Sequence, residues 1–276
     1  MRKRTISSLI LIAIVYFAVA FAGKWATALI FWLLASGGIL ECSNILKKLN
    51  VATNFVATEL ANLFLMACAV FAPLFFGVDG AIIPFCAFTI LSFAGAAAIM
   101  RNPFSRDSQA KGLSYILMLS LITMPLLCLV LLGAMFEKGF AFAIWIVVVT
   151  KFTDIGGYIF GVCFGNHKIL PKVSPGKSYE GLVGGMLSSA VMGAFFAVFF
   201  AKYMPPSFGA IDGVIFGALL GFLGLISDLA ESCLKRNANV KDSGNIIPGI
   251  GGAFDLLDSL IASSPVGFLI AIYFYL

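Results

Sequence analysis

The sequence has few charged residues. Asp, Glu, Lys and Arg make up 11% of its 276 residues, whereas hydrophobic residues make up 61%. A soluble domain carries about 25% charged residues, so this composition excludes an ordinary soluble protein and predicts a polytopic membrane protein. The net charge of +5 is small. We therefore expect the bilayer as a partner and no nucleic acid.

Residues that bind transition metals or carry redox chemistry are also scarce. His167 is the only histidine, and none of the six cysteines has C-x-x-C spacing. These absences exclude a His-rich metal site, argue against His-based catalysis and leave no zinc or redox motif. We interpret the cysteines as small apolar packing residues.

Long apolar runs fill most of the chain, and each has roughly the 20 residues that a helix needs to cross a bilayer. They lie at about 6–23, 25–40, 56–77, 80–100, 113–135, 140–164, 181–201, 213–234 and 252–275. The first run resembles a signal peptide but is long for one, and we interpret it as an uncleaved helix. The sequence thus predicts an all-α, polytopic integral membrane protein with about nine transmembrane helices. Residues 1–276 are expected to form one membrane domain, with 1–139 as a helical scaffold and 140–276 as the catalytic half.

Basic residues give these helices an orientation. With the N-terminus in the cytoplasm, 14 of the 18 Lys and Arg residues fall in cytoplasmic segments, three fall outside, and Lys151 lies within a helix. The positive-inside rule therefore predicts a cytoplasmic N-terminus and an outside C-terminus. The same orientation places segments 165–181 and 227–259 on the cytoplasmic face.

Segment 227–259 is unusually charged for its position between two apolar runs. It contains five of the 13 acidic residues, together with Lys235, Arg236 and Lys241. Charges beside membrane-length apolar runs are costly unless they face a polar cavity, a partner or an ion. We therefore predict that this segment forms the active site.

The acids of this segment occur in pairs with helical spacing. Asp228 and Glu231 are three residues apart at the end of one predicted helix, and Asp255 and Asp258 are three apart on the next. Such pairs on adjacent helices are able to converge on one divalent cation, and an oxygen-only ligand set suits Mg²⁺ better than zinc. The neighbouring bases suit a polyphosphate, so the segment predicts phosphoryl or nucleotidyl transfer.

Two other polar segments precede it. Lys151, Asp154 and Tyr158 share one helical face, either as part of a site or, for Lys151 and Asp154, as an ion pair that locks two helices. At 174–181, an expected turn at Pro175 and Gly176 precedes a helix start that suits phosphate. Gly-Lys-Ser at 176–178 resembles the end of a P-loop, but Pro171 stands where the first glycine is required, which excludes a P-loop.

The N-terminal third contains only three acids. We interpret Glu41 and Asp79 as solvated residues near helix ends. Glu59 is either a buried hydrogen-bonding residue or another residue near a helix end. None of the three is expected to belong to the active site.

Three motifs follow one another between residues 151 and 259. They read Asp154-Ile-Gly-Gly-Tyr158; Ser174-Pro-Gly-Lys177-Ser-Tyr-Glu180-Gly; and Ser232-Cys-Leu-Lys235-Arg236, Lys241-Asp242, Pro248-Gly-Ile250-Gly-Gly252, Asp255-Leu256-Leu-Asp258-Ser259. In this order they resemble the motifs of the phosphatidate cytidylyltransferases (CDP-diacylglycerol synthases). Ile250 and Leu256 stand where that family usually has His and Arg, so any role of those two side chains is absent or reassigned here.

The resemblance implies that CTP and phosphatidate react to give CDP-diacylglycerol and diphosphate. It also implies a location in the bacterial inner membrane and is compatible with a homodimer. It implies Mg²⁺ as cofactor and allows a monovalent cation such as K⁺. By analogy, Asp228 and Asp255 would bind the metal with Glu231, and Asp258 would lie nearby. The nucleotide-binding residues would be Lys235, Arg236, Lys241, Asp242 and Asp154. Ser174 and Lys177 would orient the lipid phosphate, and the residues with catalytic roles would be Asp228, Asp255, Lys235 and Asp258.

Two other functions are compatible with parts of the pattern. A CTP-dependent polyprenol or lipid kinase would use a similar set of acids and bases. An ion-coupled transporter would use Lys151, Asp154 and Asp228 as intramembrane carriers, but the charges gather at one predicted face rather than at the midplane of repeated halves. A CDP-alcohol phosphatidyltransferase would need an Asp-Gly-x-x-Ala-Arg motif, which the sequence lacks.

Overall fold

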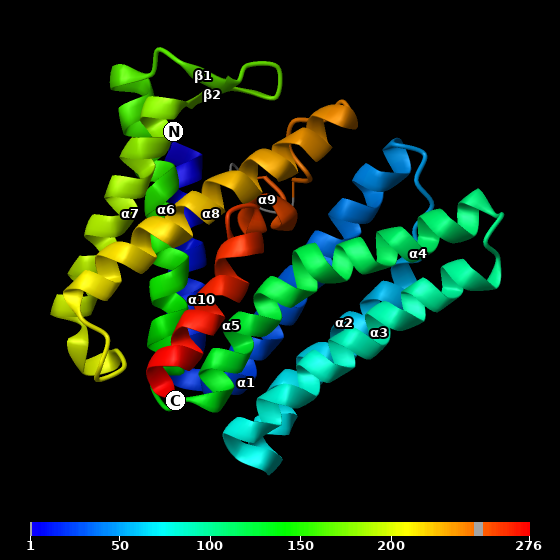
Figure 1. The fold of residues 1–276 in the computed structure, drawn as a ribbon, viewed down its shortest axis with the longest axis horizontal. Coiled ribbons are helices and arrows are strands. Elements are labelled where there is room, and N and C mark those ends of the chain that lie inside the picture. The colour runs from blue at the N-terminus through cyan, green and yellow to red at the C-terminus, as the bar shows by residue number, and fades with distance from the viewer. Residues whose placement is uncertain (1, 246–250) are drawn as a thin grey trace. The chain divides into compact units, whose positions relative to one another are not determined.

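The computed structural model describes residues 2–245 and 251–276, with side chains from residue 25 onward. Almost every element in it is a helix (Figure 1). The chain divides into two compact units, residues 1–135 with 237–257 and residues 136–236 with 258–276. Pro248, Gly249 and Ile250 of the motif lie outside the described residues.

The first unit begins with one long helix, α1 (Arg2–Lys48). Two helices with a break near Lys24 were expected here, but α1 is continuous through that point. The junction between the two apolar runs contains Gly23 and no proline, and a single glycine disfavours a helix by only about 1 kcal/mol. The count of nine spans is therefore not confirmed, and the orientation of the termini stays a prediction.

The next helices of the first unit fold back on one another. They are α2 (Phe55–Phe76), the 3₁₀ turn η1 (Gly77–Ala81), α3 (Ile82–Arg101), α4 (Arg106–Met118), the π-helical turn η2 (Leu119–Thr123), α5 (Met124–Met135) and, after α8, the short α9 (Ala253–Leu257). At the turn between α2 and α3, Gly77 has φ +62°, and a Cβ at Gly80 would lie 2.4 Å from the carbonyl oxygen of Ala72. Leucines of α5 that are fully buried form much of this unit's core.

The second unit contains α6 (Gly139–Phe164), β1 (Lys168–Leu170), β2 (Ser174–Ser178), α7 (Tyr179–Phe199), η3 (Ala201–Tyr203), α8 (Ala210–Asn237) as far as Arg236, and α10 (Leu260–Tyr275). Helices α6 and α7 pack along each other (Figure 1). A Cβ at Gly181 would lie 2.8 Å from the carbonyl oxygen of Gly157, so these glycines let the two helix backbones approach closely.

The segment between α6 and α7 corrects one expectation. A turn at Pro175 and Gly176 was predicted, but residues 168–178 form a small antiparallel hairpin, within an otherwise all-α fold, in which Lys168 pairs with Ser178 and Leu170 with Ser174. The turn therefore lies at 171–173, and Pro175 and Gly176 belong to β2. A hairpin satisfies the backbone of this segment internally, which isolated loops do not.

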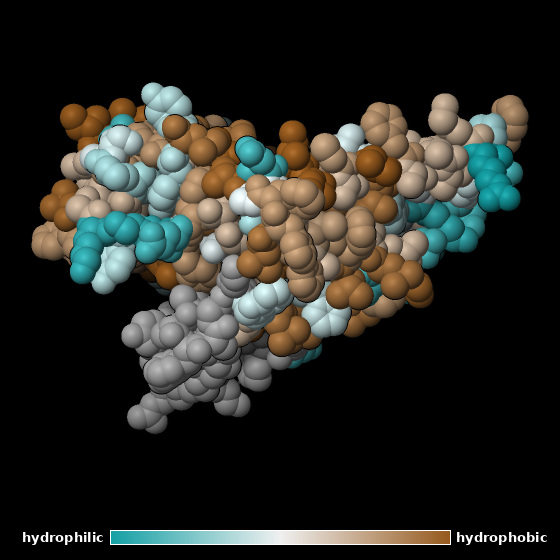
Figure 2. Space-filling view, turned by 90° about the horizontal axis from the view of Figure 1, so that it is seen from below, coloured by the Kyte–Doolittle hydropathy of each residue, from teal (hydrophilic) through white to brown (hydrophobic). Residues whose placement is uncertain are grey.

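The surface of the helices is apolar. Figure 2 shows large hydrophobic areas on one face, and side chains such as Phe75, Phe93 and Phe199 are each more than 70% exposed. Among the described residues, six helical stretches are long and apolar enough to cross a membrane, and Leu260–Tyr275 is a shorter apolar helix. One of the six, Phe55–Arg101, contains both α2 and α3. These features establish a membrane protein that is helical apart from the hairpin.

The close contact of α7 with α8 gives a prediction about stability. A Cβ at Gly193 would lie 2.0 Å from the carbonyl oxygen of Gly213, whereas one at Gly209 would meet only the Asp212 carboxylate, at 3.6 Å. Gly193→Ala should therefore destabilise the fold by about 1–3 kcal/mol, because backbone must move to accept the methyl group. The measurement is the thermal unfolding midpoint in detergent, with Gly209→Ala as matched control. Equal midpoints for the two variants would contradict this packing.

Candidate active site

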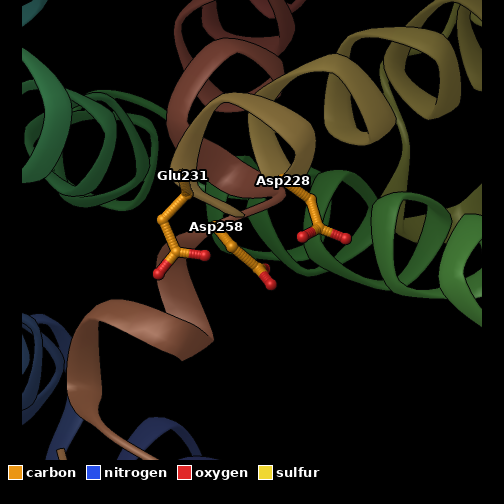
Figure 3. A group of neighbouring side chains, drawn as sticks. All are labelled: Asp228, Glu231 and Asp258. Atoms are coloured by element: carbon orange, nitrogen blue, oxygen red, sulfur yellow. The ribbon is translucent and has the colours of Figure 1, made fainter. Parts of the chain in front are cut away.

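Three acidic side chains of the second unit converge. Asp228 and Glu231 lie one turn apart on α8, and Asp258 precedes Ser259, the N-cap residue of α10. One carboxylate oxygen of each lies within 4.8 Å of the other two (Figure 3). We call these three residues the acid cluster. The expected convergence of acids from two helices is thus present, with Asp258 as the member from the second helix.

Each acid of the cluster has a lysine partner from a different element. Lys151 of α6 donates to Asp258 at 3.1 Å and to the Ser259 hydroxyl at 2.7 Å. Lys177 of β2 pairs with Asp228. Lys235, one turn beyond Glu231 on α8, pairs with it at 2.9 Å. Opposite charges at these distances offset the cost of removing each group from water. Each carboxylate of the cluster therefore has an ammonium group beside it.

The predicted pair of Lys151 and Asp154 is present but is not the main contact of the lysine. Their Nζ–Oδ2 distance is 3.8 Å, longer than the 3.1 Å between Lys151 and Asp258. The i,i+3 spacing along α6 suggested Asp154 as the partner of Lys151. Asp258 is 107 residues away in sequence, so local spacing could not indicate it. Tyr158, on the same predicted face, is exposed.

The hairpin is joined to the end of α8. Arg236 donates from Nε to the carbonyl oxygen of Val173, in the turn of the hairpin, at 3.1 Å. Together with the pair between Lys177 and Asp228, this bond gives the hairpin two polar contacts to α8. Ser178 caps α7 by accepting from the Gly181 N–H at 3.1 Å, so the hairpin leads directly into that helix. Ser174 lies in the same strand, opposite Leu170.

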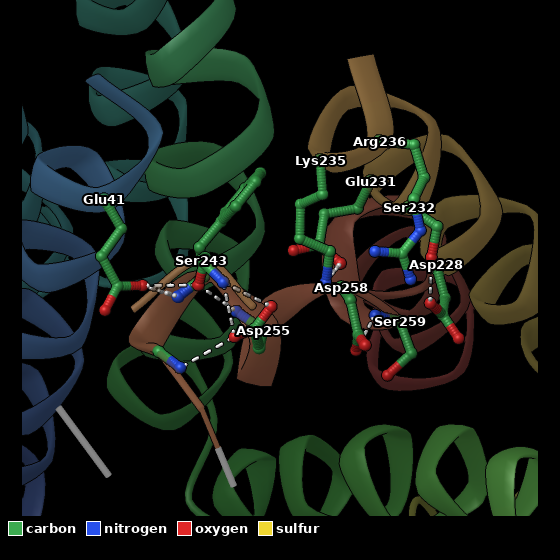
Figure 4. A network of polar contacts seen from close by, with 12 residues as sticks. Glu41, Asp228, Glu231, Ser232, Lys235, Arg236, Ser243, Asp255, Asp258 and Ser259 are labelled. Carbon is green, nitrogen blue, oxygen red and sulfur yellow. Dashed lines mark hydrogen bonds and ion pairs between the residues drawn. The ribbon is translucent and has the colours of Figure 1, made fainter. Parts of the chain in front are cut away.

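Asp255 belongs to a polar network of the first unit (Figure 4). Its carboxylate accepts hydrogen bonds from the backbone N–H of Ser243, at 2.9 and 3.2 Å, and from that of Gly252, at 2.8 Å. Gly251 has φ +126°, a conformation that L residues rarely adopt. Lys241 and Asp242 are exposed residues just before Ser243. The predicted metal-binding role of Asp255 stays a prediction.

Glu41 was expected to be solvated, and this is wrong. It is only 4% exposed. Its Oε2 accepts hydrogen bonds from the Ser243 hydroxyl at 2.8 Å and from the Phe254 N–H at 2.9 Å. These partners are more than 200 residues away in sequence, so no local pattern could reveal them. Glu59, by contrast, accepts hydrogen bonds from Ser36 and, at 3.4 Å, from Asn62. A hydrogen-bonding role was one of the two alternatives considered for it.

Comparisons with known proteins agree with the motifs. A model of the cytidylyltransferase family matches residues 2–274. A Bacillus subtilis protein named phosphatidate cytidylyltransferase is 28% identical over 276 residues, or 98% of each chain. A Pseudomonas aeruginosa protein of the same name is 43% identical over 121 residues, or 44% of each chain. An uncharacterized Escherichia coli protein, YnbB, is 36% identical over 136 residues, or 48% of this chain and 43% of its own. In the last two matches the chain spans less than half of the relative's length.

The buried pair on α8 gives a prediction that needs no substrate. Lys235 is 7% exposed and Glu231 is 3% exposed. Lys235→Met should lower stability by about 3–5 kcal/mol because the Glu231 carboxylate then stays buried without this partner, and adding Glu231→Leu should recover part of the loss. Thermal unfolding in detergent measures both changes.

The control is Lys111→Met, which removes a lysine from an exposed pair of the same i,i+4 spacing, with Asp107. It should change the midpoint little, because exposed ion pairs contribute little to stability. A Lys235→Met midpoint as high as that of Lys111→Met would show that the buried pair has no such energetic role.

Proposed function

The chain belongs to the cytidylyltransferase family, and from this premise we propose that it transfers the cytidylyl group of CTP to phosphatidate. The products are CDP-diacylglycerol, an intermediate of phospholipid synthesis, and diphosphate. The observation that carries the proposal is the acid cluster with its three lysine partners, because carboxylates that hold a metal beside cations that hold phosphates are what nucleotidyl transfer requires.

The reaction requires little acid–base chemistry from the protein. A phosphate oxygen of phosphatidate attacks the α-phosphorus of CTP, a new P–O bond forms, and the bond to the β-phosphate oxygen breaks. The electron pair of that bond leaves with diphosphate. The nucleophile is already anionic at neutral pH, so positioning and charge neutralisation supply most of the rate enhancement. A chain with a single histidine is compatible with such a mechanism.

The acid cluster suits Mg²⁺ as cofactor. All of its donors are carboxylate oxygens, the ligands that Mg²⁺ prefers. One oxygen of each acid lies within 4.8 Å of the other two, so all three could approach one bound ion. We assign Asp228, Glu231 and Asp258 as the described residues able to hold the ion, and we keep Asp255 as a further proposed ligand. When bound, Mg²⁺ would neutralise the phosphate charge that develops as diphosphate leaves.

The lysines would bring the two substrates together. Lys177 contacts Asp228, so a lipid phosphate bound by Lys177, with Ser174 of the same strand beside it, would lie next to the acid cluster. Lys235 and Arg236 lie on the end of α8, close to the same acids, and we assign them with Lys241 to the phosphates of CTP. Asp154 and Asp242 are proposed as further nucleotide contacts.

The proposal includes a location for the reaction. We infer that the acid cluster faces the cytoplasm from the bacterial inner membrane, in a chain of about nine spans with an outside C-terminus. The distribution of 14 basic residues on one predicted side against three on the other supports this orientation. CTP is a cytoplasmic nucleotide, so this orientation would give it access to the acid cluster.

The reaction itself is the first test. Purified protein in mixed micelles with phosphatidate, CTP and Mg²⁺ should release diphosphate in amounts equal to the CDP-diacylglycerol formed, and chelation of Mg²⁺ should stop it. CTP labelled at the α-phosphate should transfer its label to lipid, whereas label at the γ-phosphate should not. Transfer of γ-label would favour a lipid kinase instead. Absence of transfer with phosphatidate in every lipid mixture tried would sink the proposed activity.

Neutral amides in place of the acids are the second test. Asp228→Asn and Asp258→Asn should each lower kcat by at least about 100-fold and weaken the Mn²⁺ affinity measured by electron paramagnetic resonance, because each removes a charged ligand. Asp255→Asn should abolish turnover while the protein stays folded. Asp107→Asn, at an exposed acid of α4, is the control and should be unaffected. Near-wild-type activity of any cluster variant would remove that residue from the proposed metal site.

A further inference from the structure

We propose that Glu41 is a positioning residue, which fixes the segment that carries Asp255. The expected effect of Glu41 on turnover rests on the proposed function. The contacts of Glu41 rest only on the structure of the first unit. Glu41 lies on α1, in the part of the chain that sequence patterns assign to a scaffold, outside all three motifs.

Burial of the Glu41 carboxylate needs compensation, because an ionised carboxylate away from water is costly without hydrogen bonds or opposite charge. Oε2 receives one hydrogen bond from the Ser243 side chain and one from the Phe254 backbone. These donors stand at the two ends of segment 243–254. One carboxylate oxygen therefore contacts both ends of the segment that contains Gly251 and Gly252.

The glycines of this segment make room for Glu41. A Cβ at Gly244 would lie 2.2 Å from Oε1, and a Cβ at Gly252 would lie 2.1 Å from Oε2. The three heavy atoms nearest to the Gly244 position all belong to the Glu41 side chain. Gly252 is the last residue of the Pro-Gly-Ile-Gly-Gly motif, so the presence of Glu41 gives a physical reason for a glycine at that position.

Ser243 connects Glu41 to Asp255. Its hydroxyl donates to Glu41 and accepts from the Asp255 N–H at 3.3 Å, while its own N–H donates to the Asp255 carboxylate. Gly252, held against Glu41, donates its N–H to the same carboxylate. Glu41 thus bonds to the side chain of Ser243 and lies beside Gly252, the two residues whose N–H groups donate to the Asp255 carboxylate. We infer no contact between Glu41 and substrate.

Three variants of the full-length protein test this role, with Glu137→Ala as matched control because Glu137 is an exposed glutamate. Glu41→Ala should lower kcat for CDP-diacylglycerol formation by about 10- to 100-fold, because Asp255 loses its orientation. Glu41→Gln should keep more activity than Glu41→Ala, because its amide oxygen still accepts hydrogen bonds. In hydrogen–deuterium exchange, Glu41→Ala should speed exchange of the amides at 243, 252 and 254, and Glu137→Ala should not.

The Gly244→Ala variant provides a reciprocal test that does not depend on how well Glu41→Ala folds. The added methyl group meets Glu41 and should lower kcat and speed exchange in the wild-type background. In the Glu41→Ala background the obstacle is gone, so the same methyl group should have little further effect. An equal effect in both backgrounds would overturn the proposed contact.

The outcomes separate this inference from the proposed function. If the wild type shows no cytidylyl transfer but exchange follows the pattern above, the proposed function fails and the structural anchor stands. If the wild type is active and Glu41→Ala matches it in both kcat and exchange, the proposed function stands and the role of Glu41 is refuted.

Discussion

Pairing of opposite charges in apolar surroundings is the condition on which the second unit depends. An unpaired buried ion costs several kcal/mol, and the side chains of Asp228 and Asp258 are less than a fifth exposed. Lys151, Lys177 and Lys235 each offset one carboxylate, and they come from α6, β2 and α8. Two of these pairs connect different elements: Lys151–Asp258 joins α6 to the start of α10, and Lys177–Asp228 joins β2 to α8, whereas Lys235–Glu231 lies within α8. The hairpin is held beside α8 by Lys177 and Arg236.

The same pairing gives the proposed chemistry a simple physical form. On the proposed function, a bound metal ion would offset the carboxylate charge of the acid cluster, and Lys177 and Lys235 would contact the phosphates of the substrates.

The first unit solves a similar problem with hydrogen bonds. Glu41 Oε2 accepts hydrogen bonds from the Ser243 hydroxyl and the Phe254 N–H, and the Asp255 carboxylate accepts them from the N–H groups of Ser243 and Gly252. Such bonds depend on a fixed backbone, which explains why glycines 244 and 252 stand where a side chain would collide with Glu41. Helix α1, which was predicted to be scaffold, thereby contacts the motif at 248–252 of the predicted catalytic half through Glu41.

The sequence by itself determined the membrane class, five helices (α2, α3, α6, α7 and α8) to within several residues, and the acids of α8, because apolar length and helical spacing are local properties. It also indicated the family, through motifs whose order is visible in one dimension. Only the tertiary structure decided which charges meet. It chose Asp258 over Asp154 as the main partner of Lys151, turned residues 168–178 into a hairpin and buried Glu41 against Ser243. These contacts join residues far apart in sequence, and the free energy that selects them comes from packing and desolvation, which no local pattern records.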